Sequence, residues 1–435
     1  MERPLAVRVV IVLGLVAASS VARGPVPVDA QRGGMFLGSS EDPAIAYSTS
    51  PLDNAVTEVN AKLRDGSVRL TFEGRSGYLR SALGALGIPV ESQMLVFSQT
   101  SFQRRHISEA NPRALFFNDR AALGWVRDGE IIEVAAQDAR QGMVFYTLDQ
   151  RQVERPEFQR VLTCLACHKA GDTLGVPGML MFSTTAPSDE GVPPKSVMTD
   201  HRSPLEDRWG GWYVTGRSGA VRHHGNQSTA IGASRDRDLS SAAGLFDPDG
   251  YQSMSSDIVA LLVLSHQIHM ANLITRVGWE ARAADPALHA PFVAAPGEER
   301  RIAQMMSGIA TEFVDYLLLV DEAPLADSVR GSSAFAERFA AIGPRDAKGR
   351  SLHELDLAHR LLKYPCSYEI YSAAFDALPP PAKDPIYRRM WDVLSGAERG
   401  ERYRSALPLA DRQAIVEILK DTKRDLPAYF QRVSR

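Results

Sequence analysis

Residues 164–168 read Cys-Leu-Ala-Cys-His, and the hydrophobic pattern of the chain changes on either side of this stretch. From residue 51 to 153, short apolar or alternating runs separated by turn-forming residues predict strands with a few helices. Residues 154–250 are rich in Gly, Pro, Trp and His and show no clear period, which predicts loops. From residue 251 onward apolar residues recur at helical spacing. The sequence therefore predicts an α+β fold, with a small mixed N-terminal sheet, a loop-rich segment and a mainly α-helical C-terminal region.

The expected elements follow from local periodicity and from helix-breaking residues. Strands are expected at 68–72, 94–98, 114–117, 131–135 and 143–148. Helices are expected at 52–63, 79–86, 258–273, 302–317, 352–362, 368–378, 386–394 and 410–420. Three consecutive prolines at 379–381 cannot continue a helix and separate two of them. Residues 23–50 are expected to form an extended lead-in.

The motif at 164–168 has the spacing of a c-type haem attachment site. Two thiols three positions apart on one helical turn can bond to one edge of a porphyrin, and the next residue can place its imidazole beneath the iron. Cys164 and Cys167 are the expected thioether anchors, and His168 is the expected axial iron ligand. The other ring nitrogen of His168 should donate a hydrogen bond to a backbone carbonyl or a similar acceptor.

Two other uses of these residues fit the sequence less well. A thioredoxin-like dithiol would follow a strand in a βαβ unit, whereas a short proline-flanked approach precedes Cys164. A zinc site would need a second pair of ligands, and the remaining cysteine, Cys366, is isolated. Aromatic residues flank Cys366, so we expect a buried and inert thiol there.

At this motif the sequence resembles the c-type cytochromes, although the resemblance covers only these five residues. It implies one covalently bound haem c, held by Cys164 and Cys167 with His168 on the iron, and an electron-transfer role with a redox partner protein. The motif lies deep in a chain of 435 residues. In that layout the chain is similar to large single-haem cytochrome-like proteins of environmental bacteria.

The sixth iron ligand is left open by the sequence, and the candidates are Met179, His201, His223 and His224. The choice matters because methionine raises the reduction potential, a second histidine lowers it, and an open position admits small molecules. Aromatic residues at 209–213 either line the haem or begin a strand at Trp212, in which case His223 and His224 are solvated. His266 and His269 share one helix face and are either ligands or core residues.

The N-terminus predicts export. Arg3 and Arg8 precede an apolar run at 9–18, and small residues follow at 20–22, as in a cleaved signal peptide spanning residues 1–22. An uncleaved anchor is the alternative. The expected location is the periplasm or the extracellular space, with no membrane span after signal cleavage. The net charge of −3 leaves no cationic excess, which argues against nucleic acid as a partner.

Two functions remain open at this point. The first is electron transfer by an exported mono-haem c-type cytochrome. The second is a single-haem oxidoreductase with an open or displaceable sixth coordination site. Chain length favours the second, because electron carriage needs only a small part of 435 residues.

Overall fold

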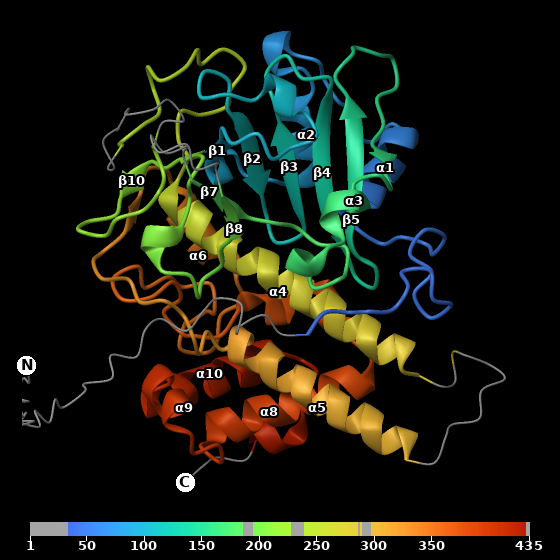
Figure 1. Ribbon diagram of the computed structural model, residues 1–435, viewed down its shortest axis with the longest axis vertical. Coiled ribbons are helices and arrows are strands. Elements are labelled where there is room, and N and C mark those ends of the chain that lie inside the picture. Colours follow the sequence, from blue (N-terminus) through green and yellow to red (C-terminus); the bar gives the residue numbers. More distant parts are fainter. Residues whose placement is uncertain (1–33, 186–194, 228–238, 286–287, 289–296, 432–435) are drawn as a thin grey trace, which may run out of the picture. The chain divides into compact units, whose positions relative to one another are not determined.

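A seven-stranded sheet forms the upper half of the molecule in Figure 1, with helices on both of its faces. The computed structural model describes residues 34–185, 195–227, 239–285, 288 and 297–431. The fold is α+β, with 38% of residues helical and 15% in strands. The strand order is β6-β5-β4-β3-β2-β1-β9. The bounds are β1 Met94–Val96, β2 Arg113–Phe117, β3 Ala121–Trp125, β4 Ile131–Asp138, β5 Gly142–Asp149, β6 Gln159–Arg160 and β9 Trp212–Tyr213.

The expectation of a small mixed sheet is wrong, because each pairing described within this sheet is antiparallel. Short connections are the physical reason from β2 to β6, since a parallel pair needs a long crossover. Strands β2 and β3 are joined through a turn in which the Asn118 side chain accepts hydrogen bonds from the amides of Arg120 and Ala121. The β4–β5 turn closes at Gly142, whose φ of 82° suits glycine.

The two faces of the sheet pack against different layers. Buried and half-buried residues alternate along β4, as a strand with two distinct faces requires. Ile132 and Val134 point to the face covered by α1 (Ala55–Arg64) and α2 (Leu79–Leu86). Part of the opposite face is covered by the long helix α4 (Ile258–Ala283), which crosses the lower end of the strands in Figure 1.

Helix α4 is the central helix of the fold. Asp257 caps its start by accepting hydrogen bonds from the amides of Val259 and Ala260. Helix α4 is long and apolar enough to cross a bilayer by length and composition, yet its most apolar 18-residue window is wholly buried in the fold. Burial of this kind is also found in the core helix of a soluble domain. That no segment after residue 22 spans a membrane stays a prediction.

The remaining helices pack beyond α4, and Figure 1 shows α5 and α8 to α10 below it. Their bounds are α5 Glu298–Leu317, α6 Phe335–Ile342, α7 Ala373–Asp376, α8 Pro380–Ser395, α9 Glu401–Ala406 and α10 Leu409–Thr422. Helix α8 begins within the proline run, because proline is tolerated in the first turn of a helix. Residues 35–435 form one compact unit. The expected boundaries at 51–153, 154–250 and 251–435 stay a prediction, and the expected signal peptide at 1–22 lies outside the described residues.

Two expected elements are absent from the described chain. Residues 352–362 form turns and bends instead of a helix. The Asp356 carboxylate accepts hydrogen bonds from the amides of Ala358 and His359, which competes with helical hydrogen bonding. Residues 68–72 are not a strand, since the Thr71 amide donates to the Ser81 hydroxyl on α2.

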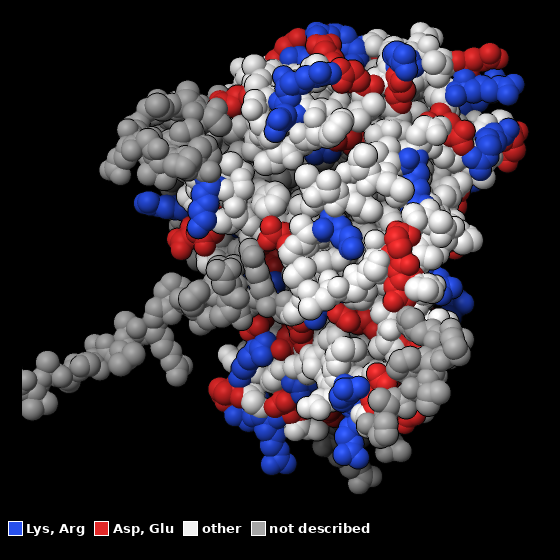
Figure 2. All heavy atoms as spheres, turned by 45° about the vertical axis from the view of Figure 1, so that its right-hand side comes forward, with Lys and Arg blue, Asp and Glu red and all other residues white. Residues whose placement is uncertain are grey.

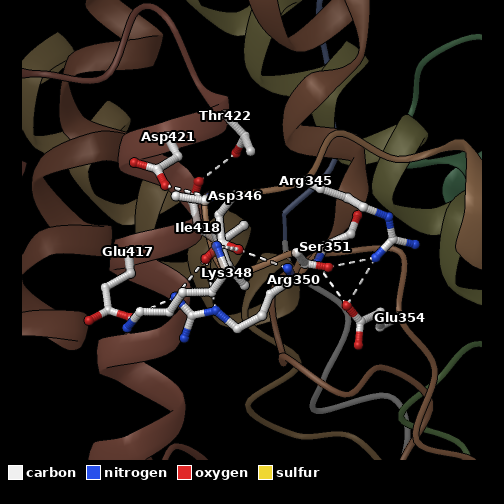
Figure 3. A network of polar contacts seen from close by, with 12 residues as sticks. Arg345, Asp346, Lys348, Arg350, Ser351, Glu354, Glu417, Ile418, Asp421 and Thr422 are labelled. Carbon is white, nitrogen blue, oxygen red and sulfur yellow. Dashed lines mark hydrogen bonds and ion pairs between the residues drawn. The ribbon is translucent and has the colours of Figure 1, made fainter.

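The segment before residue 352 is attached to α10 by charged side chains, as Figure 3 shows. Arg350 donates to Asp346 at 2.8 Å and to Glu417 at 2.6 Å. Lys348 donates to the same Glu417 carboxylate at 2.8 Å, and the Ala347 amide donates to Asp421. These contacts hold an irregular segment in place without helical structure.

Basic and acidic side chains intermingle on the face drawn in Figure 2. Neither sign forms a continuous field on that face, which agrees with the net charge of −3. The absence of a nucleic-acid partner stays a prediction.

Candidate functional site

The Cys-Leu-Ala-Cys-His motif folds as a single helical turn, α3 (Leu165–His168). Cys164 occupies the N-cap position, and its carbonyl accepts hydrogen bonds from the amides of Cys167 and His168. Both thiols are free; Cys164 is half-buried and Cys167 is exposed. The local fold thus brings the three predicted site residues onto one turn at the edge of the sheet, beside β5.

The His168 side chain is held from two directions. Its ring packs against Phe145 of β5, with ring centroids 4.6 Å apart. Its Nδ1 atom lies 2.9 Å from the carbonyl oxygen of Gly178, so the predicted hydrogen bond to a backbone carbonyl is confirmed. Burial lowers the pKa of His168, which favours the neutral imidazole. With Nδ1 donating to Gly178, the neutral ring keeps a lone pair on Nε2, and that atom is available to a metal.

The loop that contains Gly178 is fixed to its surroundings. The Gly178 amide donates back to the His168 carbonyl at 2.9 Å. The Asn272 side chain on α4 accepts from the Met179 amide at 3.2 Å and donates to the Met179 carbonyl at 3.0 Å. A Cβ atom on Gly178 would lie 2.2 Å from Asn272 Oδ1, so this close approach requires glycine. Helix α4 therefore sets the position of the carbonyl that orients His168.

Beside His168 the sheet presents small, half-exposed side chains. Phe145 lies opposite Ala135 on β4, and Ala135 lies opposite Ala122 on β3. In the neighbouring row Leu115 lies opposite Gly124. Ala122, Ala135 and Leu115 are only partly buried in the described structure. This strip of β2–β5 therefore presents partly exposed apolar side chains, against which an apolar ring system can pack.

A charged pair crosses the same strip. Arg113 on β2 and Glu133 on β4 form an ion pair of 2.8 Å, and the Arg113 guanidinium lies over Gly124, where a Cβ atom would be 2.3 Å away. Burial raises the pKa of the Cys164 thiol, and the Glu133 carboxylate adds to that shift. Glu133 therefore lies close enough to the motif for its charge to act on it.

The segment between β1 and β2 forms the far rim of this surface. Ser101 donates to Glu133 at 3.2 Å, and Gln103 donates to the Ile131 carbonyl at 3.1 Å. Between them Phe102 is 87% exposed.

The residues present fit a covalently attached haem. Two free thiols lie on one turn, the Nε2 atom of the neutral imidazole has no hydrogen bond to a described residue, and a strip of partly exposed apolar side chains adjoins it. Within the described residues, no cluster of three or more His, Cys, Asp or Glu suited to a bare metal ion is present.

The four candidates for the sixth ligand lie in different surroundings. Met179 is 7% exposed and belongs to the main hydrophobic core. Its backbone amide and carbonyl pair with Asn272 of α4. A sixth ligand has to approach the iron from the side opposite His168, beyond Nε2.

The histidine candidates also make contacts of their own. The Nδ1 atoms of His201 and His266 lie 2.7 Å apart. His223 is buried with its ring 5.5 Å from Trp209, and His224 is half-buried. Of the alternative that combined a strand at Trp212 with solvated histidines, the strand is present as β9, whereas the solvated state is wrong for His223, which is buried. The contacts described for these residues do not connect them to the motif.

One cluster of polar residues could not be assembled from the sequence. Arg202 pairs with Asp200 at 2.6 Å and contacts His269 Nε2 at 3.3 Å. Tyr316 of α5 packs on His201 and His269, with ring centroids 4.1 and 4.6 Å apart respectively. The helical spacing of His266 and His269 was a signal for one side of this cluster. That spacing does not indicate that residues 200–202 pack against these two histidines.

The cluster is deeply buried. Burial lowers the pKa of His266 to about 3 and that of His269 to about 4, so both imidazoles are neutral near pH 7. Cys366, which is also buried as expected, lies next to Ser367, whose hydroxyl is 2.7 Å from His266 Nε2. We assign the cluster a structural role, because it attaches the segment at 195–208 to α4 and α5.

Comparison with known proteins does not assign a function to this site. No protein-family model matches the chain, and neither the curated proteins nor the solved structures contain a match.

Proposed function

We propose that this chain is an exported mono-haem c-type cytochrome that acts in electron transfer. In this proposal Cys164 and Cys167 carry one haem c covalently, and His168 is the axial iron ligand. The protein would act in the periplasm or outside the cell and exchange electrons with a redox partner protein.

The observation that carries the proposal is the contact between His168 Nδ1 and the Gly178 carbonyl at 2.9 Å. It selects the tautomer and the ring orientation that an iron ligand requires. A structural histidine could make the same contact, but two free thiols on the same helical turn would then have no role.

The bound group would supply one-electron chemistry at its iron. The protein chain would supply the surroundings of the haem. Phe145 packs on the imidazole, the strip containing Ala122 and Ala135 offers an apolar surface, and the Arg113–Glu133 pair adds charge next to the motif.

The surroundings of the candidate sixth ligands support a second function, that of a single-haem oxidoreductase with an open sixth site. Met179 is buried in the hydrophobic core, and His201 is engaged with His266. Such an arrangement supports a position that a small molecule can occupy.

The test of the main proposal uses the full chain, produced in a bacterium that has a cytochrome c maturation system. We expect one haem per chain that remains bound after denaturation and acid–organic extraction, measured by haem staining and by the pyridine haemochrome spectrum. The double variant Cys164→Ala/Cys167→Ala should lose this haem, whereas Cys366→Ala, which removes a buried thiol away from the motif, should keep it. A colourless wild-type chain from that host would refute the proposal.

Binding of carbon monoxide then separates the two functions. Rapid binding to the ferrous protein at neutral pH indicates an open sixth site and favours the oxidoreductase. No binding indicates two strong axial ligands and favours simple electron transfer.

A further inference from the structure

A second site is formed by a cavity of about 480 Å³ that is built from elements other than α3. It lies between α2, the β2–β3 turn, α4 and α6. Its volume is in the range of small-molecule sites in proteins. Asp119, Arg338 and Ile342 line it and are exposed, so the cavity opens to solvent.

Aromatic rings form much of its buried wall. Phe117 of β2 and Phe335 of α6 lie 5.4 Å apart, and Phe335 and Phe339 stack at 5.9 Å. The faces of such rings carry negative electrostatic potential, which attracts cations. Leu83 and Ile88 add apolar side chains, and Asn118, Asp119, Gln267 and Arg338 form the polar part of the lining.

The charges at the opening favour a positive ligand. The Arg338 guanidinium is already paired with Glu91 at 2.9 Å. The Asp119 carboxylate makes no hydrogen bond or ion pair with a described residue, and its neighbour Arg120 is paired with Glu58. Among the charged side chains that line the cavity, Asp119 is therefore the one without a hydrogen bond or ion pair to a described residue.

The buried side of the cavity adds no cation. The Gln267 side chain donates to the Asn118 carbonyl at 2.8 Å and accepts from the Tyr368 hydroxyl at 3.0 Å. Burial, reinforced by the Asp119 charge, raises the pKa of the nearby Glu369 well above its usual range. Asp119 is thus the acidic side chain in the lining of the cavity, and the basic side chain there, Arg338, is paired with Glu91.

We propose that this cavity binds a small organic ammonium ion, with its alkylated nitrogen against the phenyl rings of Phe117, Phe335 and Phe339 and its charge facing Asp119. Quaternary ammonium groups are recognised in this way, by aromatic faces together with a carboxylate. An inorganic cation would gain few oxygen ligands beyond the Asp119 carboxylate in exchange for its hydration, and a neutral apolar molecule would leave the carboxylate without a partner. The proposal is independent of haem attachment.

Calorimetric titration of the full chain with choline, compared with 3,3-dimethylbutan-1-ol, tests the proposal. The second molecule has the shape of choline with carbon in place of the charged nitrogen. We expect choline to bind at least tenfold more tightly than this neutral analogue, and its affinity to fall severalfold as salt concentration rises. Equal binding of the two molecules, or binding of neither, would overturn the proposal.

Two substitutions locate the binding. Gly84 of α2 lines the cavity and has open space where a side chain would begin, so Gly84→Leu should fill the cavity and abolish choline binding. Gly308→Leu, at an exposed position of α5 with equal space, is the matched control and should bind as wild type. Asp119→Asn should weaken choline about tenfold and leave the neutral analogue unchanged, whereas Asp384→Asn on the surface of α8 should change neither. Unchanged binding by Gly84→Leu or by Asp119→Asn would contradict the assignment.

Discussion

The Nδ1 atom of His168 and the carbonyl oxygen of Gly178 lie 2.9 Å apart, and Gly178 is itself held against Asn272 of α4. The orientation of the imidazole therefore depends on the central helix of the fold as well as on the motif. A c-type haem site in this chain would be preorganised by contacts far apart in the sequence.

Substitution of Gly178 tests that dependence. A Cβ atom there would lie 2.2 Å from Asn272 Oδ1, so Gly178→Ala has to displace the loop and its carbonyl. We expect a loss of about 1–3 kcal/mol in the free energy of unfolding, as for other overpacked sites, and a lower yield of covalently bound haem. Urea denaturation and haem staining measure the two effects.

Gly171→Ala is the matched control, because an added Cβ at Gly171 meets no atom within 4 Å. It should keep wild-type stability and haem content. Equal behaviour of the two variants would show that the contact with Asn272 does not position His168.

The charge of Glu133 provides a second test. Its carboxylate acts on Cys164 and pairs with Arg113 at 2.8 Å. A negative charge near iron stabilises the ferric state, so Glu133→Gln should raise the midpoint potential of the haem protein, and the unpaired Arg113 should add to the rise. Potentiometric titration followed by optical spectroscopy measures it.

Glu157→Gln serves as the comparison for Glu133→Gln. Glu157 precedes β6 and pairs with Arg64 near the surface. Its charge is better screened by solvent, so the potential should stay close to the wild-type value. A fall in potential for Glu133→Gln would contradict the proposed place of this carboxylate beside the iron.

Local patterns predicted the elements that carry strong periodicity. Helix α2 has the predicted bounds, and β2, β4 and β5 lie where apolar alternation placed them. Strand β3 reads Ala-Ala-Leu-Gly-Trp, a composition with low strand propensity, and it forms because β2 and β4 flank it. The antiparallel order and the joining of β9 to β1 depend on tertiary contacts that a single sequence does not reveal.

The motif is recognisable because its two cysteines and its histidine lie within five consecutive residues. The sequence predicts a hydrogen bond from His168 to a backbone carbonyl or a similar acceptor, but it does not identify Gly178 as the residue that accepts it. The partners of Asp200 are up to 69 residues away, as in its contact with His269. Contacts between residues so far apart in the sequence depend on the tertiary fold. They could therefore not be predicted from the sequence alone.

Breaking the buried ion pair of Asp200 and Arg202 should cause a large loss of stability. Burial opposes the ionisation of Asp200, yet Arg202 and His269 hold the pKa of this carboxyl well below its usual range. Asp200→Asn removes the charge and leaves Arg202 buried without a counter-ion. We expect a loss of about 3–5 kcal/mol in the free energy of unfolding, measured by urea denaturation at pH 7.

Two further variants serve as comparisons for the stability of Asp200→Asn. Asp200→Asn/Arg202→Gln removes both charges and should be more stable than Asp200→Asn alone. Glu401→Gln breaks an exposed pair with Arg404 and should change stability by less than about 1 kcal/mol. A loss for Asp200→Asn as small as that for Glu401→Gln would show that the buried pair contributes little.

Acid sensitivity of the fold can be examined at His353. Its ring lies between Phe339 and Tyr368, with centroids 5.1 and 4.9 Å away, and its Nδ1 atom has no hydrogen-bond partner among the described residues. Burial lowers its pKa from 6.5 to about 4. As pH falls below 6.5 the unfolded chain takes up a proton at this site before the folded chain does, so stability is present above that pH and is lost toward pH 4.

The variant His353→Phe removes this titration and the unpaired nitrogen while keeping an aromatic ring. Relative to wild type, it should gain stability as pH falls from 7 to 4, by an amount on the order of 3 kcal/mol at the acid end. Urea denaturation at a series of pH values measures the difference. His359→Phe, at an exposed histidine, is the control and should leave the pH dependence unchanged. A difference between His353→Phe and wild type that is constant from pH 7 to pH 4 would show that His353 titrates alike in the folded and unfolded chains.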